Sequence, residues 1–180
     1  MSYIYRQMSK QEVMIVEKTH FEQQLNEEIA VYNRQPRLKV FPVDFSEVTS
    51  FDEILEDKML LIYMIRAGIP FSLFDLIKTA TPFTESDWAN FLDLSTKSLQ
   101  RYKAEAGFNF KPIHTEKILE MAEVTKAGLE VFGDMEKLKL WLNTPNYSLG
   151  SMKPIELLKD SYGKNMVLDE LLRIEHGIFV

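Results

Sequence analysis

Apolar residues recur at the spacing of a helix face through most of the chain beyond residue 45. Ser50 and Glu53 have the spacing of a capping box, and Gly68 is typical of a helix end. One helix is predicted between these signals, and it is followed by a second short helix over residues 71–78. The apolar positions of the first helix are Ile54, Leu55, Met59, Ile62 and Ile65.

The first 45 residues have a mixed pattern. Four apolar residues follow a helix face, namely Phe21, Leu25, Ile29 and Tyr32. Glu12 to Thr19, in contrast, alternates almost as well as a strand, and Lys39-Val40-Phe41 between Pro36 and Pro42 fits at most a short edge strand. We expect an accessory arm, partly helical with a possible short strand, that wraps the body or a second copy. A mobile leader without a function fits the pattern equally well.

A helix-turn-helix pattern lies over residues 87–103. A short apolar helix is followed by a tight turn that holds Leu94, and Ser95 caps a second helix. Ala89 is small where the two helices approach, and Leu99 is placed to hold the second helix on the first. The outer face of the second helix offers hydrogen-bond donors for phosphates and base edges: Thr96, Lys97, Ser98, Gln100, Arg101 and Lys103. A three-helix core with a solvated basic face would give the same pattern.

The remaining residues predict a long helix and then several short ones. The long helix runs from Ile113 to Phe132, and His114 at its start is expected to be a surface or capping residue. Asp134 is placed to cap the next helix, and Pro154 to begin another. Tyr162-Gly163 is interpreted as a break before a last helix over residues 164–176. After Gly177 the chain is apolar, which requires packing on its own domain, a second copy or a partner: Ile178, Phe179 and Val180.

Composition limits the functions that are compatible with this pattern. The 180 residues include 21 basic and 27 acidic side chains, and only residues 95–126 have a basic excess, with six basic and four acidic groups. A nucleic-acid surface would therefore be local and modest. No cysteine is present, and the three histidines do not have the spacing of metal ligands. The sequence also contains no nucleophile elbow and no Gly-rich phosphate loop. We therefore expect no enzyme activity, no metal and no cofactor.

Export and membrane insertion are not indicated by the sequence. The longest apolar run, residues 59–65, is far shorter than the roughly twenty residues that a membrane span needs. The first residues lack the charged and then apolar pattern of a signal peptide. A cytoplasmic protein of one domain, or of two small domains that share a core, is the expectation.

Residues 131–180 contain a series of landmarks in a fixed order. This series resembles the toxin-binding domain of the Xre/MbcA/ParS-like antitoxins, and residues 67–124 resemble the Xre-type helix-turn-helix half that precedes it in this family. Residues 1–45 lie outside the resemblance. The landmarks are Val131-Phe132-Gly133-Asp134, Trp141-Leu142, Pro145-Asn146, Leu149-Gly150, Lys153-Pro154-Ile155-Glu156-Leu157-Leu158, Tyr162-Gly163 and Leu171-Leu172-Arg173-Ile174-Glu175-His176-Gly177-Ile178.

The resemblance implies a type II antitoxin that silences a RES-domain toxin, an enzyme that depletes NAD⁺. The C-terminal domain would cover the active site of the toxin, and the helix-turn-helix half would bind operator DNA, usually as a dimer, and repress the shared operon. The implied toxin contacts are Arg173, Glu175, His176, Gly177, Ile178, Phe179 and Val180. Most of Trp141, Leu157, Leu168, Leu171 and Leu172 are expected in the core instead.

We therefore expect an all-α fold in three parts. Residues 1–45 form the arm, residues 46–126 a multi-helix body with the helix-turn-helix, and residues 127–180 a small helical toxin-binding domain. The body is acidic and Glu105 follows close on Lys103, so DNA affinity is expected to be weak or to require the toxin complex. The alternative function is a stand-alone helix-turn-helix regulator without a toxin partner, which would leave residues 177–180 without a role.

Overall fold

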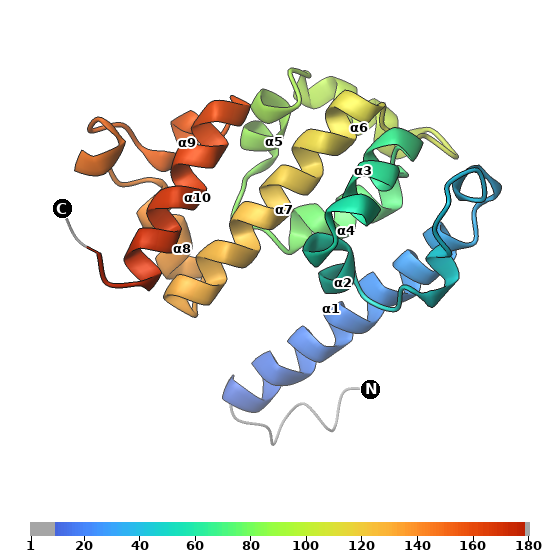
Figure 1. Ribbon diagram of the computed structural model, residues 1–180, viewed down its shortest axis with the longest axis horizontal. Coiled ribbons are helices and arrows are strands. Elements are labelled where there is room, and N and C mark those ends of the chain that lie inside the picture. Colours follow the sequence, from blue (N-terminus) through green and yellow to red (C-terminus); the bar gives the residue numbers. More distant parts are fainter. Residues whose placement is uncertain (1–9, 179–180) are drawn as a thin grey trace.

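The structure, a computed structural model, describes residues 10–178, with side chains from residue 21 onward. Over this range the chain forms ten α-helices and three 3-10 helices, and it contains no sheet. The all-α prediction is confirmed. Helix α7 (Pro112–Phe132) crosses the centre of the molecule, with α10 (Ser161–Glu175) packed along one side of it and α3 (Lys58–Ala67) along another (Figure 1). No helix in residues 10–178 is both long and apolar enough to cross a membrane.

The N-terminal arm is built on one helix, α1 (Lys10–Asn33). The strand interpretation of Glu12–Thr19 is wrong, because a helix satisfies its backbone hydrogen bonds internally and needs no partner strand. The helix face predicted from the sequence is confirmed: Leu25, Ile29 and Tyr32 are buried, and α1 packs on α4 (Phe71–Thr79). The first half of α1 projects beyond the body (Figure 1).

The predicted short strand at Lys39-Val40-Phe41 is also wrong. The segment consists of turns between two 3-10 helices, η1 (Pro36–Leu38) and η2 (Phe45–Glu47). The amide of Phe41 donates to the carbonyl of Leu38 three residues earlier, so the backbone bonds locally and not to a neighbouring strand. The ring of Phe41 packs 4.9 Å from the ring of Tyr63, which anchors the turn to α3.

The stripe predicted as one helix over residues 50–67 is divided into two helices. Helix α2 (Phe51–Glu56) begins after Ser50, whose hydroxyl accepts a hydrogen bond from the amide of Glu53. Asp57 then ends α2 and caps α3, because its carboxylate accepts from the amides of Met59 and Leu60. The apolar spacing continues through this break, and periodicity alone therefore conceals it.

Gly68 joins α3 to the rest of the body at a very close approach. Its φ of +77° lies in the left-handed region, and a Cβ there would meet the carbonyl oxygen of Phe110 at 2.4 Å. Beyond it, α4 packs the ring of Phe74 edge-on against Trp88 and Phe110, at centroid distances of 5.2 and 4.9 Å. These aromatic side chains are almost fully buried and form the centre of the body.

The C-terminal part contains α8 (Met135–Leu142), η3 (Tyr147–Leu149), α9 (Pro154–Leu157) and α10. Asp134 caps α8 as predicted, since its carboxylate accepts from the amide of Lys137. The break predicted at Tyr162-Gly163 is wrong, because both residues belong to the first turn of α10. A Cβ on Gly163 would lie 2.1 Å from the carbonyl oxygen of Leu157, so this glycine permits α10 to pack against α9.

Candidate functional site

The end of α10 is a sharply defined turn. Gly177 has φ +67°, the amide of Ile178 donates to the carbonyl of Arg173 at 2.9 Å, and the amide of Gly177 donates to the carbonyl of Ile174 at 3.0 Å. These two bonds form a Schellman motif, which fixes the direction in which the chain leaves the helix. The side chain of Ile178 directly after the turn is 55% exposed.

Most of the predicted toxin contacts lie on the surface around this turn. Glu175, His176, Gly177 and Ile178 are exposed. Arg173 is half-buried, and its guanidinium lies 3.6 Å from the carboxylate of Glu170. Phe179 and Val180 lie outside the described residues. The exposed predicted residues are therefore contiguous at one end of α10.

Sequence reasoning missed three further residues on the same helix. Tyr162, Met166 and Leu172 are 89%, 46% and 53% exposed, and at 3.6 residues per turn they lie opposite the buried Val167 and Leu171. The expectation that most of five apolar residues lie in the core is confirmed, because Leu171 is buried and Trp141, Leu157 and Leu168 pack against the core. Leu172 is the exception. The sequence did contain a signal for this face, because Tyr162 and Met166 are out of register with the core positions of the helix.

The buried carboxylate of Glu170 connects α10 to the neighbouring segment of the C-terminal module. Glu170 is 9% exposed and accepts a hydrogen bond from the side-chain amide of Asn146 at 3.3 Å. It thereby connects α10 to η3, whose Tyr147 is 85% exposed. Several large apolar side chains are thus exposed on one small module, which is typical of a surface that binds another protein.

The second candidate surface is the helix-turn-helix. Helix α5 (Glu85–Phe91) begins with a capping box between Thr84 and Asp87, and α6 (Thr96–Ala104) is capped by Ser95. Leu94 donates its amide to the carbonyl of Ala89 at 2.9 Å, and Leu99 is buried as predicted. The predicted arrangement of two short helices around a tight turn is therefore present.

The six predicted DNA-binding residues differ in their availability. Ser98 is half-buried, and the other five are exposed. Lys103 turns toward α4, where its ammonium lies 3.2 Å from the carboxylate of Asp75. The guanidinium of Arg101 lies over the ring of Tyr102, and Gln100 donates weakly to Glu85. Thr96 and Lys97 have no side-chain partner among the described residues.

Burial and a neighbouring cation depress the pKa of His114 at the start of α7. Its ring is half-buried and lies edge-on to Phe110 at 6.1 Å, and its Nδ1 has no hydrogen-bond partner among the described residues. Burial, and then the charge of Lys111, lower the pKa of this imidazole. His114 therefore lies partly at the surface, as expected, and packs partly in the body. No group of side chains suitable for a metal ion is found within residues 21–178.

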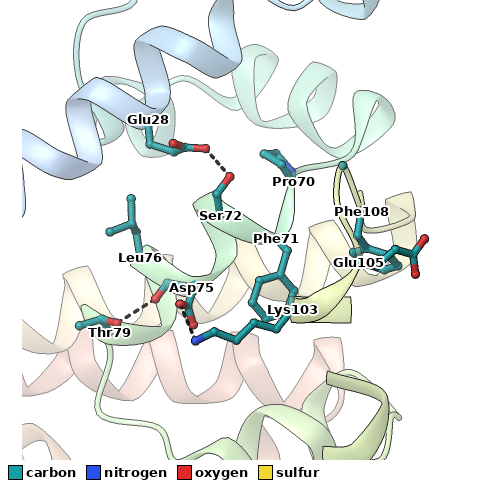
Figure 2. Close-up of a pocket in the computed structure, with 11 residues that line it drawn as sticks. Glu28, Pro70, Phe71, Ser72, Asp75, Leu76, Thr79, Lys103, Glu105 and Phe108 are labelled. Atoms are coloured by element: carbon teal, nitrogen blue, oxygen red, sulfur yellow. Dashed lines mark hydrogen bonds and ion pairs between the residues drawn. The ribbon is translucent and has the colours of Figure 1, made fainter. Parts of the chain in front are cut away.

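A groove of about 520 Å³ lies on another side of the body, between α1, α4 and the segment after α6 (Figure 2). The groove is lined by apolar side chains, called here its floor, and by carboxylates, called here its rim. The floor consists of Phe71, Leu76 and Phe108, and the rim of Glu28, Asp75 and Glu105. Of the predicted toxin contacts that the structure describes, none lines this groove, and Lys103 is the one predicted DNA-binding residue that does.

Comparison with known proteins first defines the class of the C-terminal module. Residues 127–177 match a family model described as the antitoxin Xre/MbcA/ParS C-terminal toxin-binding domain. The matched range includes α8, η3, α9 and α10, and therefore the whole exposed face of α10.

Two curated relatives extend the similarity over more of the chain. An antitoxin Xre from Yersinia enterocolitica is 29% identical over 121 residues, which are 67% of this chain and 81% of the relative. An antitoxin Xre from Photorhabdus laumondii is 26% identical over 116 residues, which are 64% and 78% of the two chains. The family model and both relatives confirm the resemblance to the Xre/MbcA/ParS-like antitoxins that was found in the sequence.

The solved structures that resemble this chain include a chain of the M. tuberculosis MbcT-MbcA toxin-antitoxin complex. It is 24% identical and superposes with a TM-score of 0.48, covering 60% of this chain and 97% of that chain.

Proposed function

We propose that this chain is the antitoxin of a type II toxin-antitoxin pair, and that it neutralises a RES-domain toxin by covering the active site with residues 127–180. The observation that carries the proposal is the exposed apolar face of α10. Tyr162, Met166 and Leu172 follow one side of the helix and lead to Ile178, all within or next to the segment that matches the toxin-binding model.

The physical basis is the removal of apolar surface from water. Each aliphatic side chain that becomes fully buried in an interface contributes about 2 kcal/mol, and exposed tyrosines are frequent anchors of such interfaces. Arg173 and His176 lie three residues apart near the end of α10 and supply polar groups beside the apolar ones. In this proposal the Schellman turn directs residues 178–180 into the NAD pocket of the toxin.

Co-expression with a RES-domain toxin tests the proposal, with growth and cellular NAD⁺ as readouts. The wild-type chain is expected to protect, whereas deletion of residues 178–180 or Leu172→Ser should reduce protection. Ile113→Ser is the matched control, because Ile113 is 70% exposed but lies at the far end of α7. Thermal unfolding should be unchanged in all three variants, and equal protection by the deletion variant would contradict the proposal.

A second candidate function, binding of operator DNA, is favoured by one observation. Helix α6 is capped, follows a tight turn, and presents Lys97, Gln100 and Arg101 to solvent. Carboxylates surround it, including Asp75, Glu85 and Glu105, so we propose weak binding that is sensitive to salt. We further propose that the chain acts as a homodimer, in which α1 contributes to the contact.

A further inference from the structure

The groove beside α1 has a chemical character that distinguishes it from the toxin and DNA surfaces. Phe71, Leu76 and Phe108 provide apolar surface, and Figure 2 shows Glu28 and Glu105 on opposite sides of the ring of Phe71. The rings of Phe71 and Phe108 are half-buried and therefore still accessible. The groove suits a short segment that carries both aromatic and basic side chains.

The carboxylates of the groove differ in whether a positive charge lies beside them. Asp75 lies 3.1 Å from Lys78 and 3.2 Å from Lys103, so its charge is balanced by two ammonium groups. Glu28 accepts a hydrogen bond from the hydroxyl of Ser72, which is neutral. Among the described residues, neither Glu28 nor Glu105 has an ion-pair partner. Two negative charges therefore remain at the rim.

We propose that this groove receives the segment Tyr3–Arg6 of a second copy of the chain, with Arg6 between Glu28 and Glu105. The segment is Tyr3-Ile4-Tyr5-Arg6, and residues 1–9 contain one basic and no acidic side chain. Its aromatic residues match the aromatic floor, and its charge is opposite to that of the rim. The inference deepens the proposed self-association by naming its contact, and it rests on that part of the proposed function.

Chain length requires the segment to come from another molecule. Glu28 lies about 27 Å along α1 from Lys10, at 1.5 Å per residue. Arg6 is separated from Lys10 by a stretch that spans at most about 14 Å when extended. Because this reach is shorter than the distance along α1, we infer that a chain does not place its own Arg6 beside its own Glu28. Two copies with antiparallel α1 helices would each place Arg6 near the groove of the other.

A charge-swap experiment on the full-length chain tests this contact by sedimentation over a concentration series. Arg6→Glu alone, and Glu28→Lys with Glu105→Lys, should each weaken the wild-type dimer at least about tenfold in Kd. The combination of all three substitutions should restore it. Glu116→Lys is the control, since Glu116 is exposed but does not line the groove. Glu28→Gln with Glu105→Gln keeps the side-chain size and should weaken the dimer without affecting thermal unfolding.

Photocrosslinking from position 5 in a mixture of isotopically heavy and light chains provides the second readout. Crosslinks from position 5 to the Phe108 segment should join heavy to light chains. Crosslinks confined to single chains would overturn the inference, as would a dimer that is unchanged by either charge reversal or not restored by the combination. A monomeric wild-type chain would overturn both the inference and the proposed self-association. Toxin neutralisation is tested separately by variants in residues 127–180, and its outcome does not depend on these results.

Discussion

At the scale of single residues, His114 links burial to a dependence of stability on pH. Its half-buried imidazole and the nearby charge of Lys111 favour the neutral form in the folded chain, so its pKa lies below the ordinary value of 6.5. The unfolded chain therefore binds more protons than the folded chain between these two pKa values. Stability that is fully present above pH 6.5 is lost as the pH falls toward the pKa of the folded state.

We predict that His114→Gln flattens this dependence. The free energy of unfolding of the wild type should fall between pH 7.5 and pH 5.5, because protonation is favoured in the unfolded chain near pH 6.5. The variant has no group that titrates at this position, so its decline should be smaller. Urea unfolding at both pH values measures the difference. An equal slope in both proteins would assign the pH dependence to other residues.

Glycine shows which residue-level features were predictable. Gly68, Gly133 and Gly177 were recognised as helix ends, and each has a positive φ, which is a local property of the backbone. Gly163 was interpreted as a break for the same reason, yet it lies inside α10. Its role is to leave space for the carbonyl of Leu157, a requirement set by packing between two helices that no local pattern contains.

At the scale of elements, α6 also combines features that the sequence predicts with features that depend on tertiary packing. Its bounds, its Ser95 cap and its buried Leu99 were predictable from spacing and capping chemistry. The direction of Lys103 was not, because its partner Asp75 lies on α4, distant in the sequence. Burial opposes ionisation of Asp75, but hydrogen bonds and charges from Lys78 and Lys103 outweigh it and keep the pKa of this carboxyl below its ordinary value. Lys103 is therefore held toward α4 by an ion pair, although its side chain is 62% exposed.

This difference gives a matched test of DNA binding by α6. Lys97→Ala with Arg101→Ala should abolish a salt-sensitive shift of the DNA upstream of the gene, since both side chains are exposed. Lys103→Ala should reduce binding less, because its ammonium is paired with Asp75. Fluorescence anisotropy at several salt concentrations, with and without the toxin, measures all three proteins. If the wild type binds under none of these conditions, the operator-binding proposal is wrong.

At the scale of the molecule, α7 joins the two parts that the sequence analysis separated at residue 126. Lys117 and Glu120 form an ion pair of 2.6 Å on α7, and Lys164 of α10 lies 3.4 Å from Glu123. The side chains of Lys117, Glu120 and Lys164 are 12%, 10% and 15% exposed, so this network is largely removed from water. Lys117 also donates to the carbonyl of Leu158. Periodicity identified α7 but not these contacts, which depend on how α10 is placed.

Because α7 is shared, we predict that the body and the C-terminal module unfold together. Trp88 is fully buried in the body, and the ring centroid of Trp141 lies 5.6 Å from that of Phe132 in the module. The variant Trp141→Phe therefore reports on the body through Trp88, and Trp88→Phe reports on the module through Trp141. Within each variant, the urea midpoints from fluorescence and from far-UV circular dichroism should coincide. Separate midpoints would instead show two independent domains.

Removal of the central carboxylate should destabilise both parts equally. Glu120→Gln leaves the ammonium groups of Lys117 and Lys164 largely buried without this partner, and we expect a loss of about 3 kcal/mol in the free energy of unfolding. Glu56→Gln is the control: it also removes an ion pair to α7, with Lys126, but Glu56 is 70% exposed and the loss should stay below about 1 kcal/mol. Both tryptophan reporters should shift together in Glu120→Gln. A shift of the Trp141 reporter alone would show that the network stabilises the module without coupling it to the body.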